Sequence, residues 1–241
     1  MGTAIENKVK LYFGNIKVLT KDKLVAELRK DFPTWTNNTI NTNLYRLKKN
    51  QVLNTLTRGV YTLEHRKNFQ PRADAKLKKI ASRIRRNYPF VDYCVWNTLW
   101  LNDFMLHQPF KGITVVEVEK SAVEAVFALL SVDFKYVYLN PDRVLFERYI
   151  NSKEEVIIVK HLNSEAPTIT DHHIVFPTLE KLLVDMLIDE NLFSAQQGEL
   201  DYIFKTAYKK FTINESKMKR YAARRNREEE LQKRIKTTLA K

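Results

Sequence analysis

Cysteine and glycine are scarce in this sequence. It contains a single cysteine, Cys94, and five glycines that all lie far apart. One cysteine excludes intrachain disulfide bonds and zinc sites built from several cysteines. Because no two glycines are close together, the chain has no G-x-G-x-x-G dinucleotide fingerprint, no P-loop and no G-x-S-x-G nucleophile elbow. Cys94 falls in an apolar stretch and is expected to be a small core residue.

Long apolar runs are also missing. The longest of them, such as residues 125–130, are far shorter than the roughly 20 residues that cross a bilayer. The first residues, MGTAIE, lack the basic-then-apolar layout of a signal peptide, and Glu6 stands where a myristoylation motif has Ser or Thr. We therefore expect no membrane partner and a reducing, cytoplasmic location.

The composition is that of a packed protein with an anionic partner. The 241 residues are 44% hydrophobic and carry 41 Lys and Arg against 28 Asp and Glu, a net charge of +13. The net charge is +9 over residues 1–72, +5 over 73–87, −8 over 88–190 and +7 over 191–241. Basic ends around an acidic middle indicate one surface for nucleic acid and another for a different partner. A boundary near residue 70 predicts domains at 1–70 and 71–241.

The first domain is predicted to contain three helices. Their expected bounds are residues 5–13, 21–30 and 37–49. Thr20 and Thr36 are suitable N-caps for the second and third helices. Ile40, Leu44 and Leu47 are spaced to form the buried stripe of the third helix.

The opposite face of the third helix is polar in a way that favours DNA recognition. Asn and Thr are weak helix formers, but Asn can pair bidentately with adenine and Thr can contact bases. Arg and Lys at the far end of the helix suit phosphates. The residues on this face are Asn38, Asn41, Thr42, Tyr45, Arg46 and Lys49. The alternative is an ordinary solvated face that lacks carboxylates.

Residues 52–63 predict two short strands around Arg58 and Gly59. Gly59 can supply the positive φ of a tight turn, and Arg58 would then project from the hairpin tip toward a phosphate or the minor groove. Three helices followed by such a hairpin predict a winged helix-turn-helix domain, with Arg58 as a further DNA-binding residue.

Several segments resemble one known family. LYRLK at 44–48, RGVY at 58–61 and FPTLEKLLVD at 176–185 are similar to the winged-helix domain and a later helix of abortive-infection AbiE-type antitoxins. The chain departs from that pattern at Asn50 and Asn54, where the family usually has Gly and a basic residue. The departure at Asn54 weakens any phosphate contact at that position.

The resemblance implies an antitoxin and transcriptional repressor that acts in phage defence. Such a protein represses its own toxin–antitoxin operon through inverted repeats in double-stranded DNA and neutralises a cognate nucleotidyltransferase toxin. The family is classed as type IV, in which the antitoxin need not hold the toxin tightly, so direct contact with the toxin stays open. We therefore expect a DNA-binding protein rather than an enzyme, with no cofactor and no metal.

The second domain is predicted to be mixed α/β, ending in basic helices, so the expected fold class of the chain is α+β. Asp74 should cap a basic helix at 75–87, and Ser121 and Thr178 should cap two later helices. Strands are expected at 91–95, 113–118, 136–139, 156–159 and 174–175, and two or three helices from residue 199 onward. Residues 217–236 are rich in Lys and Arg, which indicates a second phosphate-binding strip, an arm that docks on an RNA-bound toxin, or a solvated helix face.

Other functions stay open. A winged-helix transcription factor without a toxin would have the same first domain. A metal-dependent DNA-processing nuclease would use Asp92 or Asp103 with Glu117 and Glu119, because carboxylates two apart on a strand share a face and can hold Mg²⁺. The lysine that such nucleases usually place two residues after the acid is replaced here by Glu119.

Histidines offer a weaker metal alternative. His172 and His173 follow Asp171, and His161 lies ten residues earlier in the same region. Adjacent histidines on an extended chain point apart, so this pattern does not predict a metal site.

Overall fold

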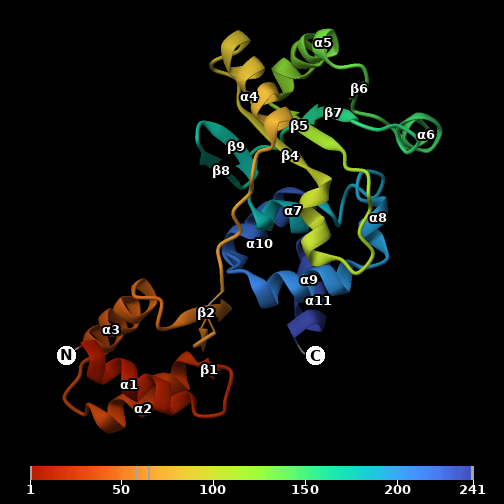
Figure 1. The fold of residues 1–241 in the computed structure, drawn as a ribbon. Helices are drawn as coiled ribbons and strands as arrows, with labels where there is room; N and C mark the ends of the chain where they lie inside the picture. The colour runs from red at the N-terminus through yellow and green to blue at the C-terminus, as the bar shows by residue number, and fades with distance from the viewer. Residues whose placement is uncertain (1, 58, 65, 240–241) are drawn as a thin grey trace. The chain divides into compact units, whose positions relative to one another are not determined.

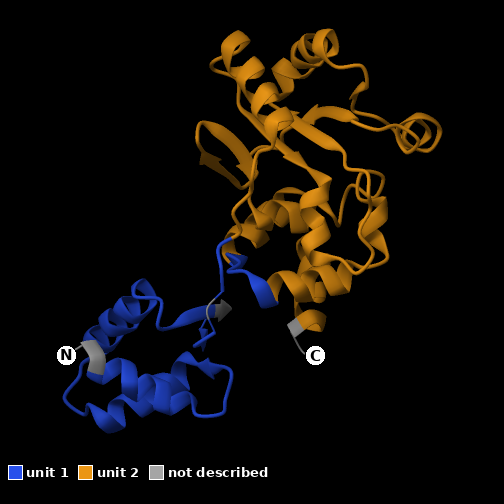
Figure 2. Cartoon of the chain, viewed as in Figure 1, with its two compact units in different colours: residues 1–68, 209–215 blue, residues 69–208, 216–241 orange. Residues whose placement is uncertain are grey.

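The computed structural model describes residues 2–57, 59–64 and 66–239 and divides into two compact units (Figures 1 and 2). Unit 1 comprises Met1–Asn68 together with Lys209–Glu215, and unit 2 comprises Phe69–Tyr208 together with Ser216–Lys241. The fold is mixed α/β and its C-terminal end is helical, which confirms the broad fold class expected from the sequence. None of the helices among the described residues is both long and apolar enough to cross a membrane.

Unit 1 begins with three helices, as the apolar spacing predicted. They are α1 (Gly2–Phe13), α2 (Lys21–Asp31) and α3 (Asn37–Lys49). The Thr20 hydroxyl accepts a hydrogen bond from the backbone N–H of Lys23, and that of Thr36 accepts one from Thr39, so both predicted N-caps are confirmed. The hydrophobic core of unit 1 includes Val9, Leu24, Leu28, Ile40, Leu44 and Leu47.

A small antiparallel sheet completes unit 1. The predicted hairpin is present as β2 (Asn54–Thr57) and β3 (Val60–Thr62), and Gly59 has the expected positive φ of +79°. Arg58 lies outside the described residues. A third strand, β1 (Leu19–Thr20), pairs with β3 and was not predicted. The residue with a left-handed backbone after α3 is Gln51, at φ +59°.

Residues 209–215 return to unit 1 through backbone pairing. The N–H of Lys67 donates to the carbonyl of Lys210 at 3.2 Å, and the N–H of Thr212 donates to the carbonyl of Lys67 at 3.0 Å. The boundary expected near residue 70 would assign residues 209–215 to the second domain, whereas they belong to unit 1. The sequence could not indicate this, because a bridge between distant segments leaves no local pattern.

Unit 2 is built on a four-stranded sheet in the order β4-β5-β7-β6. Its strands are β4 (Tyr93–Asn97), β5 (Thr114–Val118), β6 (Val137–Leu139) and β7 (Ile157–His161). β4 runs antiparallel to β5, whereas β5, β7 and β6 are parallel. A separate hairpin is formed by β8 (Thr168–Asp171) and β9 (Ile174–Pro177).

Both faces of this sheet are covered, which explains its nearly continuous apolar strands. On one face, Tyr93, Val95, Val116, Ile157 and other residues form a core with α4 (Ala75–Asn87) and α5 (Val123–Asp133). The alternate residues point to the opposite face, where α7 (Leu179–Asp185) lies (Figure 1). Cys94 is one of them and is fully buried, as expected of a small core residue.

Shorter elements connect these layers. They are the 3-10 helices η1 (Thr98–Phe104) and η2 (Lys120–Ala122), the single turn α6 (Arg143–Leu145) with the π-helix η3 (Phe146–Ile150), and α8 (Ser194–Gln197). The C-terminal helices are α9 (Leu200–Lys210), α10 (Glu215–Arg224) and α11 (Glu228–Leu239). The sequence predicted two or three helices in this region, and the described residues form three.

Several local predictions for unit 2 were confirmed and others were wrong. Asp74 caps α4, with a bond of 2.7 Å from the N–H of Leu77. Ser121 caps no helix, because its hydroxyl donates to Glu119 and α5 begins only at Val123. Thr178 precedes α7 but makes no side-chain cap. All seven residues of α7 are buried.

Candidate nucleic-acid interface and a buried ionic cluster

One face of α3 carries all the described residues that the sequence singled out for DNA. The buried stripe of Ile40, Leu44 and Leu47 is at most 2% exposed and turns the opposite side of the helix to solvent. Tyr45 on that side is 62% exposed. The exposed residues there are Asn38, Asn41, Thr42, Tyr45, Arg46 and Lys49.

These six side chains are not engaged within the protein. Among the described residues, no hydrogen bond or ion pair involves any of them. Other amides of α3 are engaged, since Arg29 Nη2 donates to Asn37 Oδ1 at 2.7 Å and Asn43 Nδ2 donates to the carbonyl of Thr39 at 3.0 Å. The free face therefore keeps its donors and acceptors available for a ligand.

The turn before α3 is held rigidly. The rings of Phe32 and Trp35 stack with their centroids 4.1 Å apart, and the N–H of Trp35 donates to the carbonyl of Phe32. Thr36 then caps the helix at 3.2 Å. These contacts orient α3 relative to α2, which places the free face at the surface of unit 1.

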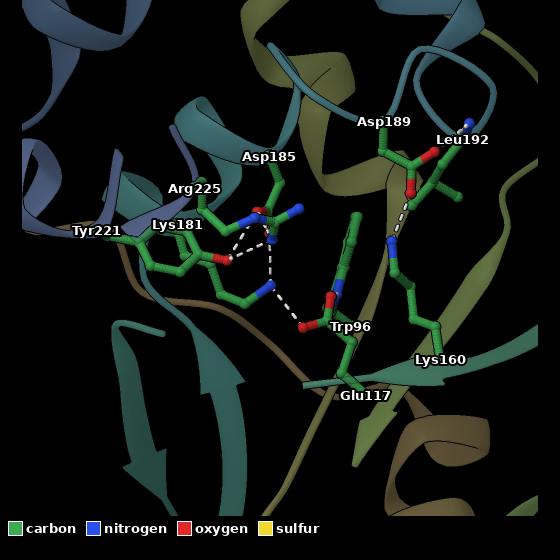
Figure 3. A network of polar contacts seen from close by, with 9 residues as sticks. All are labelled: Trp96, Glu117, Lys160, Lys181, Asp185, Asp189, Leu192, Tyr221 and Arg225. Atoms are coloured by element: carbon green, nitrogen blue, oxygen red, sulfur yellow. Dashed lines mark hydrogen bonds and ion pairs between the residues drawn. The ribbon is translucent and has the colours of Figure 1, made fainter. Parts of the chain in front are cut away.

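Unit 2 contains a buried ionic cluster that sequence reasoning missed (Figure 3). Lys181 of α7 is fully buried, and its Nζ lies 2.6 Å from Glu117 Oε2 of β5 and 2.5 Å from Asp185 Oδ2. The contact with Glu117 is an ion pair whose angles are not those of a hydrogen bond. Trp96 Nε1 of β4 donates to the other oxygen of Glu117 at 3.2 Å.

The cluster continues into the C-terminal helices. Tyr221 Oη of α10 donates to Asp185 Oδ1 at 2.8 Å, and Arg225 Nη1 approaches the same oxygen at 3.3 Å. Arg225 also donates to Tyr221 Oη at 3.2 Å. The two cations and two carboxylates balance in charge, and together they connect β5, α7 and the end of α10.

The pKa values of the cluster follow from this pairing. Burial alone would lower the pKa of Lys181, but the attraction of Asp185 and Glu117 raises it well above its usual value. Burial would raise the pKa of Asp185, but Lys181 and Arg225 lower it. Burial raises the pKa of Tyr221, and the Asp185 carboxylate raises it further. The pairing therefore favours the charged forms of Lys181 and Asp185, and both side chains are buried, which suits a structural role.

The carboxylates of the nuclease alternative do not form one site. Glu117 points into the buried cluster, whereas Glu119 follows the end of β5 and accepts a hydrogen bond from the Ser121 hydroxyl at 2.6 Å. Asp92 and Asp103 are exposed. Asp92 and Glu119 do line one polar cleft together with His161. Within the described ranges, however, no group of three or more His, Cys, Asp or Glu residues could hold a metal ion.

The adjacent histidines do not lie on an extended chain. His172 and His173 form the two-residue turn of the β8–β9 hairpin, with φ values of +46° and +63°. The carbonyl of His173 accepts hydrogen bonds from Arg85 Nη1 at 3.1 Å and from Tyr93 Oη at 3.2 Å. These residues shape a hairpin tip, and His161 lies apart from them in β7.

Four arginines of the basic C-terminal strip are paired with carboxylates. Arg224 bonds Glu165 at 2.7 Å, Arg227 lies 3.4 Å from Glu230, and Arg234 bonds Asp201 at 2.5 Å. Arg225 belongs to the buried cluster. These four arginines therefore help to hold the C-terminal helices in place.

Comparison with known proteins places the chain in a family. A family model described as a family of unknown function, DUF6577, matches residues 39–241. The chain therefore belongs to this family, and the match begins within α3 and extends through the whole of unit 2. No protein of curated function matches the sequence significantly.

Proposed function

We propose that this member of the DUF6577 family is a DNA-binding transcriptional regulator whose unit 1 is a winged helix-turn-helix domain. In this proposal α2, the turn at residues 32–36 and α3 are the helix-turn-helix, and the β2–β3 hairpin is the wing. The pairing of β1 with β3 supports this interpretation, because it attaches the hairpin to the chain segment that leads into α2. We assign the protein no catalytic role.

The free polar face of α3 carries this proposal. Asn38, Asn41 and Thr42 lie toward the N-terminal end of α3, the end that contacts base edges in helix-turn-helix proteins. Arg46 and Lys49 lie toward its other end, where cations suit phosphates. A helix face that served only stability would have little reason to hold several unengaged Asn and Thr side chains.

Charge supports the same conclusion. Residues 1–72 carry a net charge of +9. A surface of this kind displaces counterions when it binds a duplex, so its affinity should fall steeply with salt. An acidic protein partner could be bound through positive charge alone and would not require the Asn side chains on the exposed face of α3.

We further propose that the regulator acts as an AbiE-type antitoxin. On this proposal it represses its own operon through inverted repeats and neutralises a cognate nucleotidyltransferase toxin, as part of abortive infection. The support is the resemblance of residues 44–48, 58–61 and 176–185 to that family. The last of these segments spans the end of β9 and all of α7, the helix that carries Lys181 and Asp185 of the buried cluster.

The test uses the full-length protein. Binding to a labelled duplex from the region upstream of its own coding sequence is compared with binding to a scrambled duplex at low and physiological salt. We expect tighter binding to the first duplex and a steep loss of affinity with salt. Equal affinity for both duplexes, or no dependence on salt, would contradict DNA recognition.

Antitoxin action is tested separately. Growth is measured when the chain is co-expressed with a nucleotidyltransferase encoded beside it, and rescue of growth is expected. DNA binding without rescue would favour a winged-helix transcription factor that has no toxin partner.

A further inference from the structure

Four lysines that are distant in the sequence gather at one end of the β6 edge in unit 2. Lys76 and Lys79 come from α4, Lys135 precedes β6, and Lys153 precedes β7. Lys79 Nζ lies 5.0 Å and Lys76 Nζ 6.0 Å from the ring centroid of Phe134. The Nζ atoms of Lys135 and Lys153 lie 5.2 and 5.4 Å from the ring centroid of Tyr136. We call these four residues the lysine cluster.

The lysine cluster lies near the carboxylates of Asp74 and Glu155, which attract Lys76, but it is not directly paired with them. Among the described residues, none of the four ammonium groups forms an ion pair with a carboxylate, although Lys76 Nζ donates to the carbonyl of Glu155 at 2.9 Å. Burial lowers the pKa of Lys76, and attraction to Glu155 and Asp74 offsets this only in part. These ammonium groups are therefore available to attract an anionic ligand.

The adjacent strand offers unused backbone hydrogen-bonding groups. β6 is at the end of the sheet and pairs only with β7, with Tyr138 opposite Ile158. The carbonyl of Tyr136 and the N–H of Asn140 bond to β7. Because alternate residues of a strand bond to the same neighbour, the N–H and carbonyl groups of Val137 and Leu139 point away from β7. This open edge can accept one more strand.

We propose that the β6 edge binds an extended acidic peptide segment of a protein partner, which adds a strand to the sheet and places carboxylates against the lysine cluster. The open backbone edge favours a peptide over nucleic acid. The ring faces of Phe134 and Tyr136 that the lysines cover are closed to a stacked base. The adjacent Glu154 and Glu155 would repel a continuous phosphate backbone, whereas a peptide can place single carboxylates between neutral residues. The residues of this surface all belong to unit 2 and are different from those of the DNA-binding face proposed for unit 1.

The probe is a short fluorescein-labelled peptide in which Glu alternates with Val, added to the full-length protein and followed by fluorescence anisotropy. Saturable binding is expected. Replacing Lys79→Gln together with Lys153→Gln should weaken it by about fivefold to tenfold, because two exposed charge pairs are lost. The matched control, Lys120→Gln with Lys205→Gln, removes two exposed lysines elsewhere in unit 2 and should leave the affinity unchanged.

Two further measurements test the added strand. A peptide of the same sequence with alternate backbone nitrogens methylated should not bind, because it cannot pair with the edge. Val137→Pro removes an outward N–H, which an edge strand tolerates, and should abolish binding while the near-UV circular dichroism is kept. The proposal is overturned if the methylated peptide binds as well as the parent, if the lysine variant behaves like its control, or if a single-stranded oligonucleotide displaces the peptide at lower concentration than unlabelled peptide does.

Discussion

Lys181 Nζ lies 2.5 Å from Asp185 Oδ2, one turn further along α7, and both side chains are enclosed within unit 2. The lysine also reaches Glu117 of β5, and the aspartate also reaches Tyr221 of α10. One pair of residues therefore joins the central sheet to the C-terminal helices. Charges this deeply buried are tolerated only because each has a partner.

Removal of the central cation should strongly destabilise unit 2. Lys181→Met leaves Glu117 and Asp185 with unbalanced buried charge, and we expect a loss of about 3–5 kcal/mol in the free energy of unfolding. Chemical denaturation of the parent protein and the variant measures this difference in unfolding free energy. Lys111→Met is the matched control, because Lys111 Nζ lies 4.0 Å from Glu154 Oε1 in an exposed pair and its loss should cost roughly 1 kcal/mol or less. The double variant Glu117→Gln with Lys181→Met should lose less than the sum of the single changes. Additive losses would mean that the two groups do not interact.

Stability should depend on pH through Asp185. Its pKa is lower in the folded protein than its usual value, so its contribution is present above the unfolded pKa of about 3.9 and disappears as pH falls through the folded value. The difference in unfolding free energy between the parent protein and Asp185→Asn should therefore be large at neutral pH and shrink below about pH 4. A difference that stays constant down to pH 2 would show that folding does not lower the pKa of Asp185.

Base recognition should reside in the N-terminal part of α3. Asn38→Ala or Asn41→Ala should weaken binding to the specific duplex by about 1–3 kcal/mol and change binding to scrambled duplex little. Competition binding on both duplexes measures this. If both duplexes lose affinity equally, α3 is not the helix that contacts the bases.

Phosphate contacts should behave differently. Arg46→Ala and Lys49→Ala should weaken binding to every duplex to a similar degree and lower the salt slope by about one unit each. Arg58→Ala is expected to do the same if the hairpin tip contacts DNA. Lys30→Ala, which removes one charge from a surface pair with Glu27 on α2, is the control and should leave the slope unchanged. A slope that changes equally in the control would indicate a general charge effect.

Gly112 should not tolerate a side chain. A Cβ there would lie 2.4 Å from Oδ1 of Asn97, the N-cap of η1, and 2.4 Å from Cγ of Leu99 within η1. Gly112→Ala should cost about 1–3 kcal/mol of unfolding free energy through overpacking. Gly198→Ala meets nothing within 4 Å and should change stability by less than about 0.5 kcal/mol. Similar melting temperatures for the two variants would contradict this contrast.

Local sequence signals were sufficient for much of the secondary structure. Thr20, Thr36 and Asp74 were correctly identified as N-caps because each bonds a backbone N–H only three residues away. The exposed face of α3 followed from helical periodicity, since the positions of Ile40 and Leu44 determine which side turns outward. Its role in DNA binding stays a prediction.

Contacts between distant segments were decided by the tertiary structure. The spacing of Glu117 and Glu119 on a strand suggested a shared carboxylate site, but packing against α7 turned Glu117 toward Lys181 instead. Residues 88–190 are acidic overall, yet the fold brings Lys135 and Lys153 beside two lysines of α4 to form a cationic surface. A sequence by itself determines caps and periodic faces, because these depend on neighbours within one or two turns. Which charges meet depends on which elements pack together, and only the folded chain decides that.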